Sequence, residues 1–203
     1  MSSSHGGVMK FIGQSLLLFI VALSAISCGI QSIPQAQNEV EAKWAEVQNQ
    51  YQRRADLIPN LVEVVKGYAG HEKETLQSVV EARAKATAIN LDPTKLNADT
   101  MKQYAEAQGG LSSALGRLMV VVEKYPNLKA DQNFRDLQVQ LEGTENRVTV
   151  ARNRFIDSIK FFNNLVSVPP TSWTNSIFYH FEKKPQFQVD NIQEVQQAPK
   201  VKF

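Results

Sequence analysis

Few side chains in this chain have the types and spacing that catalysis requires. The histidines are His5, His71 and His180. His71 and Glu72 begin a string that resembles the zinc-binding pattern HExxH, but the fifth residue is Thr75, so the second helical ligand is missing. Neither His71 nor His180 follows a Glu by three residues, which excludes the usual di-iron pattern of four-helix bundles. A nucleophile elbow, a P-loop and a dinucleotide-binding fingerprint are also absent from the sequence. We therefore expect no enzymatic activity, no metal site and no cofactor.

The single cysteine, Cys28, carries the clearest functional signal. One cysteine cannot form an internal disulfide. It follows Lys10 and an apolar run, Leu16–Leu23, in the order typical of a signal peptide. The string Ala25-Ile26-Ser27-Cys28 resembles the bacterial lipobox, whose cysteine is diacylated and becomes the mature N-terminus. We expect residues 1–27 to be a signal peptide and Cys28 to be the lipid attachment site, because acyl chains would explain a solitary cysteine at this position.

The alternative for the N-terminus is an uncleaved membrane anchor. A helix from Phe11 to Ile30 would contain about 20 residues, which is just enough to cross a bilayer. Lipid anchor and spanning anchor both hold the remainder of the chain at a bacterial membrane, outside the cytoplasm. The sequence leaves the choice between them open.

Residues 28–38 are polar, contain Pro34, and are predicted to form a short tether before a helical region over residues 39–170. Apolar residues first recur at steps of three and four at Val40, Trp44, Val47, Tyr51, and Ala55 or Ile58. Because proline lacks a backbone N–H, Pro59 predicts a kink or break near Asp56–Pro59, with Asp56 capping a second helix. That helix is predicted to end near Asn90, before a proline-containing stop signal.

Two further helices follow, the second of them long and regular. The third segment repeats its apolar residues up to Tyr125 and is interrupted only at Gln108. Its glycines, Gly109, Gly110 and Gly116, are interpreted as positions where another helix approaches closely. The fourth segment, residues 131–168, carries an unbroken seam at Phe134, Leu137, Leu141, Thr144, Val148, Ala151, Phe155, Ser158, Phe162 and Leu165. Short connections between such helices predict an all-α fold, an antiparallel up-and-down bundle of about four long helices.

The C-terminal segment, residues 171–203, is irregular and rich in aromatic residues, which are Trp173, Phe178, Tyr179, Phe181 and Phe187. We expect this segment to fold back and cap the open end of the bundle, because such rings are more often packed than exposed. The alternative is an aromatic patch that meets a membrane interface or a partner.

The charge pattern argues against a nucleic-acid partner. The formal net charge is +2, and the longest basic clusters are the pairs Arg53-Arg54 and Lys183-Lys184. Nucleic-acid binding requires a clustered basic face. We interpret both pairs as solvated surface.

The string RRADLIPNLVEVVKGYAGHE, residues 53–72, resembles the signature of the LemA family. The resemblance continues at residues 123–138, 145–169 and 198–203, and so covers about residues 40–203. The signature residues are Arg53, Arg54, Asp56, Leu57, Ile58, Pro59, Asn60, Leu61 and Val62. The resemblance implies a membrane-anchored antiparallel helical bundle that faces away from the cytoplasm. It implies no established enzymatic activity.

Two functions fit an anchored bundle without catalytic motifs. The first is an interaction or scaffold module in the bacterial cell envelope, on the extracytoplasmic (periplasmic) side, whose helical faces dock an envelope protein not yet identified. The second is a module that binds a lipid or a small ligand between its helices or on its aromatic C-terminal segment.

Overall fold

The computed structural model describes residues 5–186, with side chains described for Gln14, residues 31–94 and residues 96–186. Its elements are α1 (His5–Ala69), α2 (Lys73–Ala88), η1 (Pro93–Lys95), α3 (Ala98–Val122), α4 (Pro126–Ala130), α5 (Gln132–Ser167), α6 (Thr171–Thr174) and the π-helical turn η2 (Asn175–Tyr179). Within residues 5–186 there is no strand. The predicted all-α fold class is therefore confirmed.

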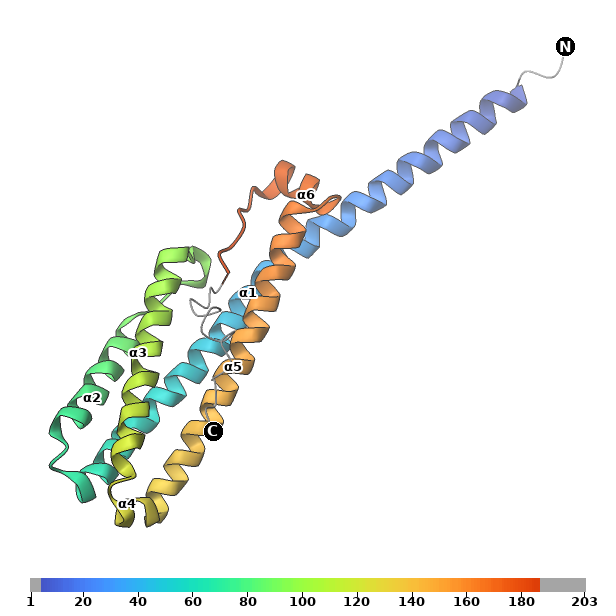
Figure 1. Ribbon diagram of the computed structural model, residues 1–203. Helices are drawn as coiled ribbons and strands as arrows, with labels where there is room; N and C mark the ends of the chain where they lie inside the picture. Colours follow the sequence, from blue (N-terminus) through green and yellow to red (C-terminus); the bar gives the residue numbers. More distant parts are fainter. Residues whose placement is uncertain (1–4, 187–203) are drawn as a thin grey trace, which may run out of the picture.

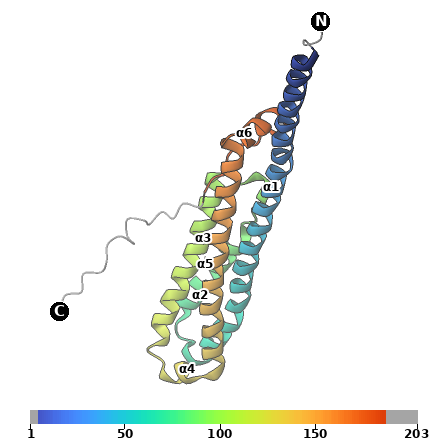
Figure 2. The ribbon, with the colours of Figure 1, turned by 90° about the vertical axis from the view of Figure 1, so that its right-hand side faces the viewer.

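The long helices α1, α2, α3 and α5 lie side by side, and each runs in the direction opposite to the one before it (Figures 1 and 2). Helix α5 packs mainly along α1, and α2 packs mainly along α3. Helix α4 lies at the end where α1 finishes and α5 begins, and α6 lies at the opposite end. The N-terminal part of α1 projects beyond α6 (Figure 1).

The tether predicted for residues 28–38 is helical in the structure. Helix α1 is continuous over 65 residues and passes through this stretch, Pro34 included. Ile33 and Ala36 are buried in the same apolar cluster as Phe162 and Val166 of α5. Their packing extends the helix into the stretch whose polar composition had indicated a tether.

The break predicted at Asp56–Pro59 is also absent, because α1 continues to Ala69. Pro59 has no N–H to donate to the carbonyl of Ala55, four residues earlier. Arg83 of α2 uses that carbonyl instead, since its Nε donates to the Ala55 oxygen at 2.8 Å. Asp56 is exposed and accepts a hydrogen bond from Gln52 at 2.7 Å, so the predicted capping role is wrong.

The second helix predicted from Asp56 to Asn90 is not a single helix, because α1 ends at Ala69 and a turn over residues 70–72 separates it from α2. Gly70 opens this turn, and glycine is a residue type common just after helices. The later helix ends follow the sequence signals more closely. Helix α2 ends at Ala88, two residues before the predicted Asn90. Asp131 begins α5, because its side chain accepts a hydrogen bond from the backbone N–H of Phe134 at 2.9 Å.

The seam predicted on the fourth helix is confirmed as the buried face of α5. Eight of its ten members are buried: Phe134, Leu141, Thr144, Val148, Ala151, Phe155, Ser158 and Phe162. Leu137 and Leu165 are partly buried against the same core. Strict alternation of steps of three and four thus placed this helix correctly.

The interpretation of the α3 glycines is wrong. A Cβ atom added to Gly109, Gly110 or Gly116 would meet no atom within 4 Å. No neighbouring helix comes close enough at these positions to require a residue without a side chain.

The described part of the C-terminal segment, residues 171–186, both packs and exposes aromatic rings. Phe181 lies edge-on to Phe162 of α5 at 5.8 Å between centroids, and Tyr179 stacks on Phe181 at 5.7 Å. Trp173 and Phe178 are 64% and 57% exposed. Phe187 and the tail after it, which belong to the predicted capping segment, lie outside the described residues.

Candidate functional site

A layer of buried polar side chains crosses the middle of the bundle. Arg54 of α1, Gln108 of α3 and Thr144 of α5 are 1%, 6% and 0% exposed. One apolar cluster lies on the α6 side of this layer and includes Tyr51 and Val148. A second cluster lies on the α4 side and includes Ile58, Leu111 and Leu141. The polar layer therefore separates the core into two apolar halves.

Arg54 is the centre of this layer and joins three helices. Its Nη2 donates to Gln108 Oε1 at 2.6 Å and to the Gln108 carbonyl at 3.2 Å. Its Nη1 donates to Ser112 Oγ and to Glu145 Oε2, both at 2.9 Å. Gln108 in turn donates from Nε2 to the Ala86 carbonyl of α2 at 3.1 Å. One buried guanidinium thus links α1 to α3 and α5 directly, and to α2 through Gln108.

The charge of Arg54 is compensated within this layer. Its guanidinium lies over the ring of Tyr51, 5.1 Å from the centroid. Glu145, its ionic partner, is half exposed, whereas Arg54 is almost wholly buried. A buried charge is tolerated only when it is paired and hydrogen-bonded. Of the three nitrogen atoms of the Arg54 guanidinium, Nη1 and Nη2 are hydrogen-bonded, and Nε has no hydrogen-bond partner among the described residues.

A groove of about 270 Å³ opens beside Arg54, between α3 and α5. Its apolar lining includes Leu115, Met119 and Leu141. Gly116 also lines it on the α3 side, where the lack of a side chain leaves open space. Glu142 and Glu145 line the α5 side. The groove therefore combines an apolar surface with a negatively charged edge.

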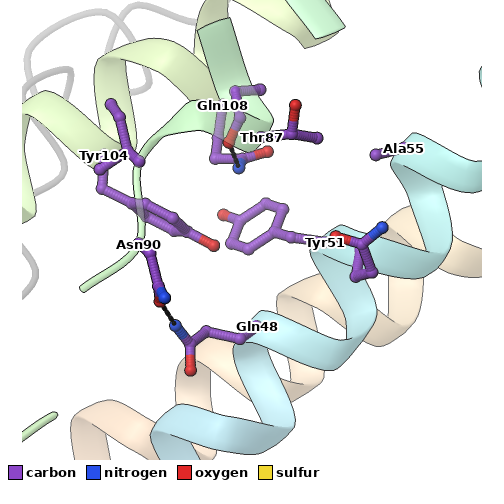
Figure 3. A pocket seen from close by; sticks show the side chains of 10 residues that line it. Gln48, Tyr51, Ala55, Thr87, Asn90, Tyr104 and Gln108 are labelled. Atoms are coloured by element: carbon purple, nitrogen blue, oxygen red, sulfur yellow. Dashed lines mark hydrogen bonds between the residues drawn. The ribbon is translucent and has the colours of Figure 1, made fainter. Parts of the chain in front are cut away.

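A second cleft, of about 290 Å³, lies on the other side of α3, between α1 and α2. Figure 3 shows the rings of Tyr51 and Tyr104 extending into it with their hydroxyl groups toward each other. The amides of Gln48 and Asn90 are joined by a hydrogen bond of 3.3 Å at its edge. Gln108 also lines the cleft and so connects it to the polar layer.

Both tyrosine hydroxyls in this cleft are held in the protonated form. Burial raises the pKa of Tyr104 well above its ordinary value, and the neighbouring Tyr51 raises it further. Burial also raises the pKa of Tyr51, and the Arg152 and Arg54 guanidinium groups oppose this only in part. Both hydroxyls therefore keep their protons to a higher pH than an exposed tyrosine would.

The signature stretch divides between the core and the surface. Arg54, Ile58 and Leu61 are buried, at the i, i+4 and i+7 positions of one helix face. Leu57 and Val62 are partly buried, and Arg53, Asp56, Pro59 and Asn60 are exposed. The interpretation of the two basic pairs as solvated surface holds for the exposed Arg53 and Lys183 but is wrong for the buried Arg54. Lys184 is partly buried, with its Nζ 5.3 Å from the centroid of the Phe162 ring.

Gln108, Ser112 and Glu145 are partners of Arg54 that were not identified from the sequence. Gln108 had the appearance of an interruption in the apolar repeat of α3. A polar residue in a buried register has to find a hydrogen-bond partner. Arg54 also lies in register with Tyr51 and Ile58 on α1. A polar residue at an apolar position of α1 and another at an apolar position of α3 were the signal from which the Arg54–Gln108 pair could have been predicted.

Cys28, the predicted lipid attachment site, falls within α1, and its side chain is outside the described side chains. Of the residues that the structure describes, none belongs to a helix with both the length and the apolar character needed to span a bilayer. His71 is exposed in the turn between α1 and α2, and Glu72 accepts a hydrogen bond from Tyr125 at 3.1 Å. In the same part of the chain, no group of three His, Cys, Asp or Glu side chains is placed to hold a metal ion.

Fold and site together define an all-helical protein in which a buried arginine joins the helices across a polar layer. Residues 43–203 match the LemA family, and the chain belongs to this family. The match covers the signature stretch, the groove, the second cleft and α6. Family membership suggests a membrane-associated helical protein.

Curated relatives align over most of the chain. The magnetosome protein MamQ of Magnetospirillum gryphiswaldense is 24% identical in an alignment 207 positions long, which covers 89% of this chain and 75% of MamQ. Protein LemA of Metamycoplasma hominis is 24% identical over 175 residues, which cover 84% of this chain and 74% of that protein. The magnetosome protein MamQ 2 of Paramagnetospirillum magneticum is 22% identical in an alignment 205 positions long, with coverage of 89% and 75%.

Proposed function

We propose that this protein is a non-enzymatic interaction module of the bacterial cell envelope, anchored by its N-terminal segment with the helical part on the extracytoplasmic side. The groove between α3 and α5 is the docking site for an envelope protein. The observation that supports this function best is the groove itself, an apolar trough over a rigid polar layer.

The groove suits a segment of protein better than it suits a reaction. Leu115, Met119 and Leu141 offer apolar contacts, and methionine adapts well to different partners. Glu142 is exposed at the edge, where one carboxylate oxygen accepts a hydrogen bond from Gln138 at 2.9 Å, and the carboxylate would attract a basic side chain of a partner. An amphipathic helix or short segment with apolar anchors and a flanking lysine or arginine has the complementary chemistry.

The continuity of α1 supports the anchoring. The same helix carries the N-terminal apolar segment and, from Ile33 to Ala69, one side of the core. A helix of 65 residues is roughly 97 Å long at about 1.5 Å per residue. An anchor on one end would therefore hold the groove at a fixed distance from the membrane.

The test is co-purification of the full chain from its own envelope after crosslinking. Gly116→Trp fills the groove, because a side chain at this position meets no atom within 4 Å. Gly109→Trp is the matched control, since it adds the same ring to α3 at a similarly open position outside the groove lining. We expect a partner to be recovered with the wild type and with Gly109→Trp, and to be lost with Gly116→Trp. Recovery of the same partner with Gly116→Trp, or of no partner from the wild type, would contradict the proposal.

A second candidate function is the binding of a small polar ligand in the cleft of Figure 3. The specific observation is the pair of buried, protonated hydroxyl groups of Tyr51 and Tyr104 beside the amides of Gln48, Asn90 and Gln108. Such groups both donate and accept hydrogen bonds. Native mass spectrometry of the purified chain should show a retained ligand that is lost in Tyr104→Phe, and a mass equal to that of the bare chain would argue against this function.

A further inference from the structure

An exposed apolar patch lies at the end of the bundle from which the N-terminal part of α1 projects. The patch consists of Val168, Trp173, Ile177 and Phe178, which are 53%, 64%, 66% and 57% exposed. Single exposed apolar residues are common, but four of them within eleven residues concentrate apolar surface at one end of the bundle, and such a concentration marks an interaction site.

Hydrogen bonds from two asparagine side chains, Asn175 and Asn163, fix the segment that carries this patch. Asn175 is buried and bonds to Phe181 at both ends of its amide, through Nδ2 to the carbonyl at 2.9 Å and through Oδ1 from the N–H at 3.0 Å. Asn163 of α5 makes the same kind of paired contact with the backbone of Lys184, at 2.9 and 2.8 Å. The four apolar side chains are therefore presented outward by a fixed turn.

The position of the patch relative to the N-terminal part of α1 indicates what covers it. Helix α6 contacts both α1 and α5 (Figures 1 and 2). The first described buried residue of α1 at this end is Ile33, in the same cluster as Val166 of α5. Cys28 precedes Ile33 by five residues, which is about 7 Å along a helix. Lipidation at Cys28 or a span ending at Ile30 would each put the bilayer surface within this distance of Ile33, which lies in the same apolar cluster as Val166, close to the end of α5 that precedes α6.

We infer that Val168, Trp173, Ile177 and Phe178 dock onto the interfacial layer of the lipid bilayer and fix the bundle against the membrane. The headgroup layer is roughly 5–7 Å thick on each side of the hydrocarbon, which matches the spacing along α1. Tryptophan and phenylalanine are suited to this layer, where the ring is apolar and its surroundings are partly hydrated. The inference rests on the proposed membrane anchoring.

The test uses Trp173 as its own reporter. The chain has two tryptophans, and Trp44 is fully buried and donates to the Leu91 carbonyl at 3.2 Å. The full chain is reconstituted into vesicles of phosphatidylethanolamine and phosphatidylglycerol whose acyl chains are brominated close to the headgroup. We expect the lipid to quench most of the Trp173 emission, and Trp173→Phe to leave only the unquenched emission of Trp44.

A matched control places the same ring on a remote surface. Val139 of α5 is 67% exposed near the α4 end of the bundle, so Val139→Trp in the Trp173→Phe background adds an exposed tryptophan far from α6. Its emission should not be quenched by the brominated lipid.

The outcomes separate the inference from the proposed anchoring. A chain that floats with the vesicles while Trp173 stays unquenched overturns the inference and leaves the anchoring intact. Trp173 emission that shifts to the blue with rising protein concentration, but is not quenched by lipid, assigns the patch to a second copy of the chain and also overturns it. A chain that fails to float with vesicles contradicts the anchoring, and the inference with it.

Discussion

Arg54 of α1 donates to the side-chain oxygen of Gln108 on α3 at 2.6 Å, although 54 residues separate them and both are almost wholly buried. Each side chain satisfies the hydrogen-bonding requirement of the other. The guanidinium needs acceptors in a place without water, and the amide oxygen needs a donor. Because the contact satisfies both only when α1 and α3 have one relative register, it selects that register among the ways in which two apolar faces could pack.

The Arg54–Gln108 pair should show strong energetic coupling. Gln108→Leu removes one acceptor from the buried charge of Arg54, whose ion pair with Glu145 remains, and should lower the free energy of unfolding by about 1.5–3 kcal/mol. Arg54→Met leaves the Gln108 oxygen unsatisfied and should lower it by about 1–3 kcal/mol. The double variant should lose at least about 1 kcal/mol less than the sum of the two. Urea unfolding of the full chain in detergent measures all three, and simple additivity would show that the two side chains do not depend on each other.

The hydrogen bond from Arg83 to the Ala55 carbonyl, which Pro59 leaves without its usual helical donor, gives a second cycle. Arg83→Met removes the donor to the Ala55 carbonyl and should lower the free energy of unfolding by about 1.5–3 kcal/mol, as expected for a hydrogen bond from a charged group. In a Pro59→Ala background, the restored N–H of residue 59 can satisfy the same carbonyl, so Arg83→Met should cost clearly less. An equal cost in both backgrounds would mean that Arg83 acts through packing alone.

Stability should fall at high pH because of Tyr104. Its pKa in the folded protein is raised above the ordinary value of 10.0 by burial. The unfolded chain loses this proton above pH 10 while the folded chain keeps it, so the contribution to stability is complete below pH 10 and is lost progressively as pH rises above it. Tyr104→Phe should make the fall between pH 10 and 11 shallower in urea unfolding. An identical slope for wild type and variant would place the Tyr104 hydroxyl in contact with solvent.

The N-terminal mass distinguishes the two possible anchors. If Cys28 is lipidated, protein extracted from the membrane should begin at a diacylglyceryl-modified cysteine and lack residues 1–27. Cys28→Ala should then block processing, so that the membrane-bound precursor accumulates. An intact N-terminus with an unmodified Cys28 would instead support the uncleaved anchor.

Local patterns predicted the parts of this fold that depend on local forces. The seam of α5 was predicted residue by residue, because a helix face repeats at fixed steps along the chain. The proline signals failed at Pro34 and Pro59 because tertiary contacts outweighed them. At Pro59 the freed carbonyl is satisfied by Arg83, which is 28 residues away from Ala55 and belongs to another helix.

The candidate site could be predicted only in part for a similar reason. The signature stretch pointed to Arg54, but its burial depends on Gln108, Ser112 and Glu145, which lie 54, 58 and 91 residues further along the chain. The groove between α3 and α5 has no local pattern at all, because the residues that line it come from helices far apart in the sequence. Gly116, interpreted as a point of close helix approach, instead keeps this groove open.

The docking of an envelope protein in the groove between α3 and α5 is tested most directly by a photo-crosslinking amino acid at Met119, which lines the groove, in the full chain in its own envelope. The same amino acid at Val80, 49% exposed on α2 and outside the groove lining, is the control. We expect illumination to join the Met119 position to one envelope protein and to give no product at Val80. No adduct at Met119 in membrane-inserted protein, or the same products from both positions, would contradict a partner-docking function for this groove.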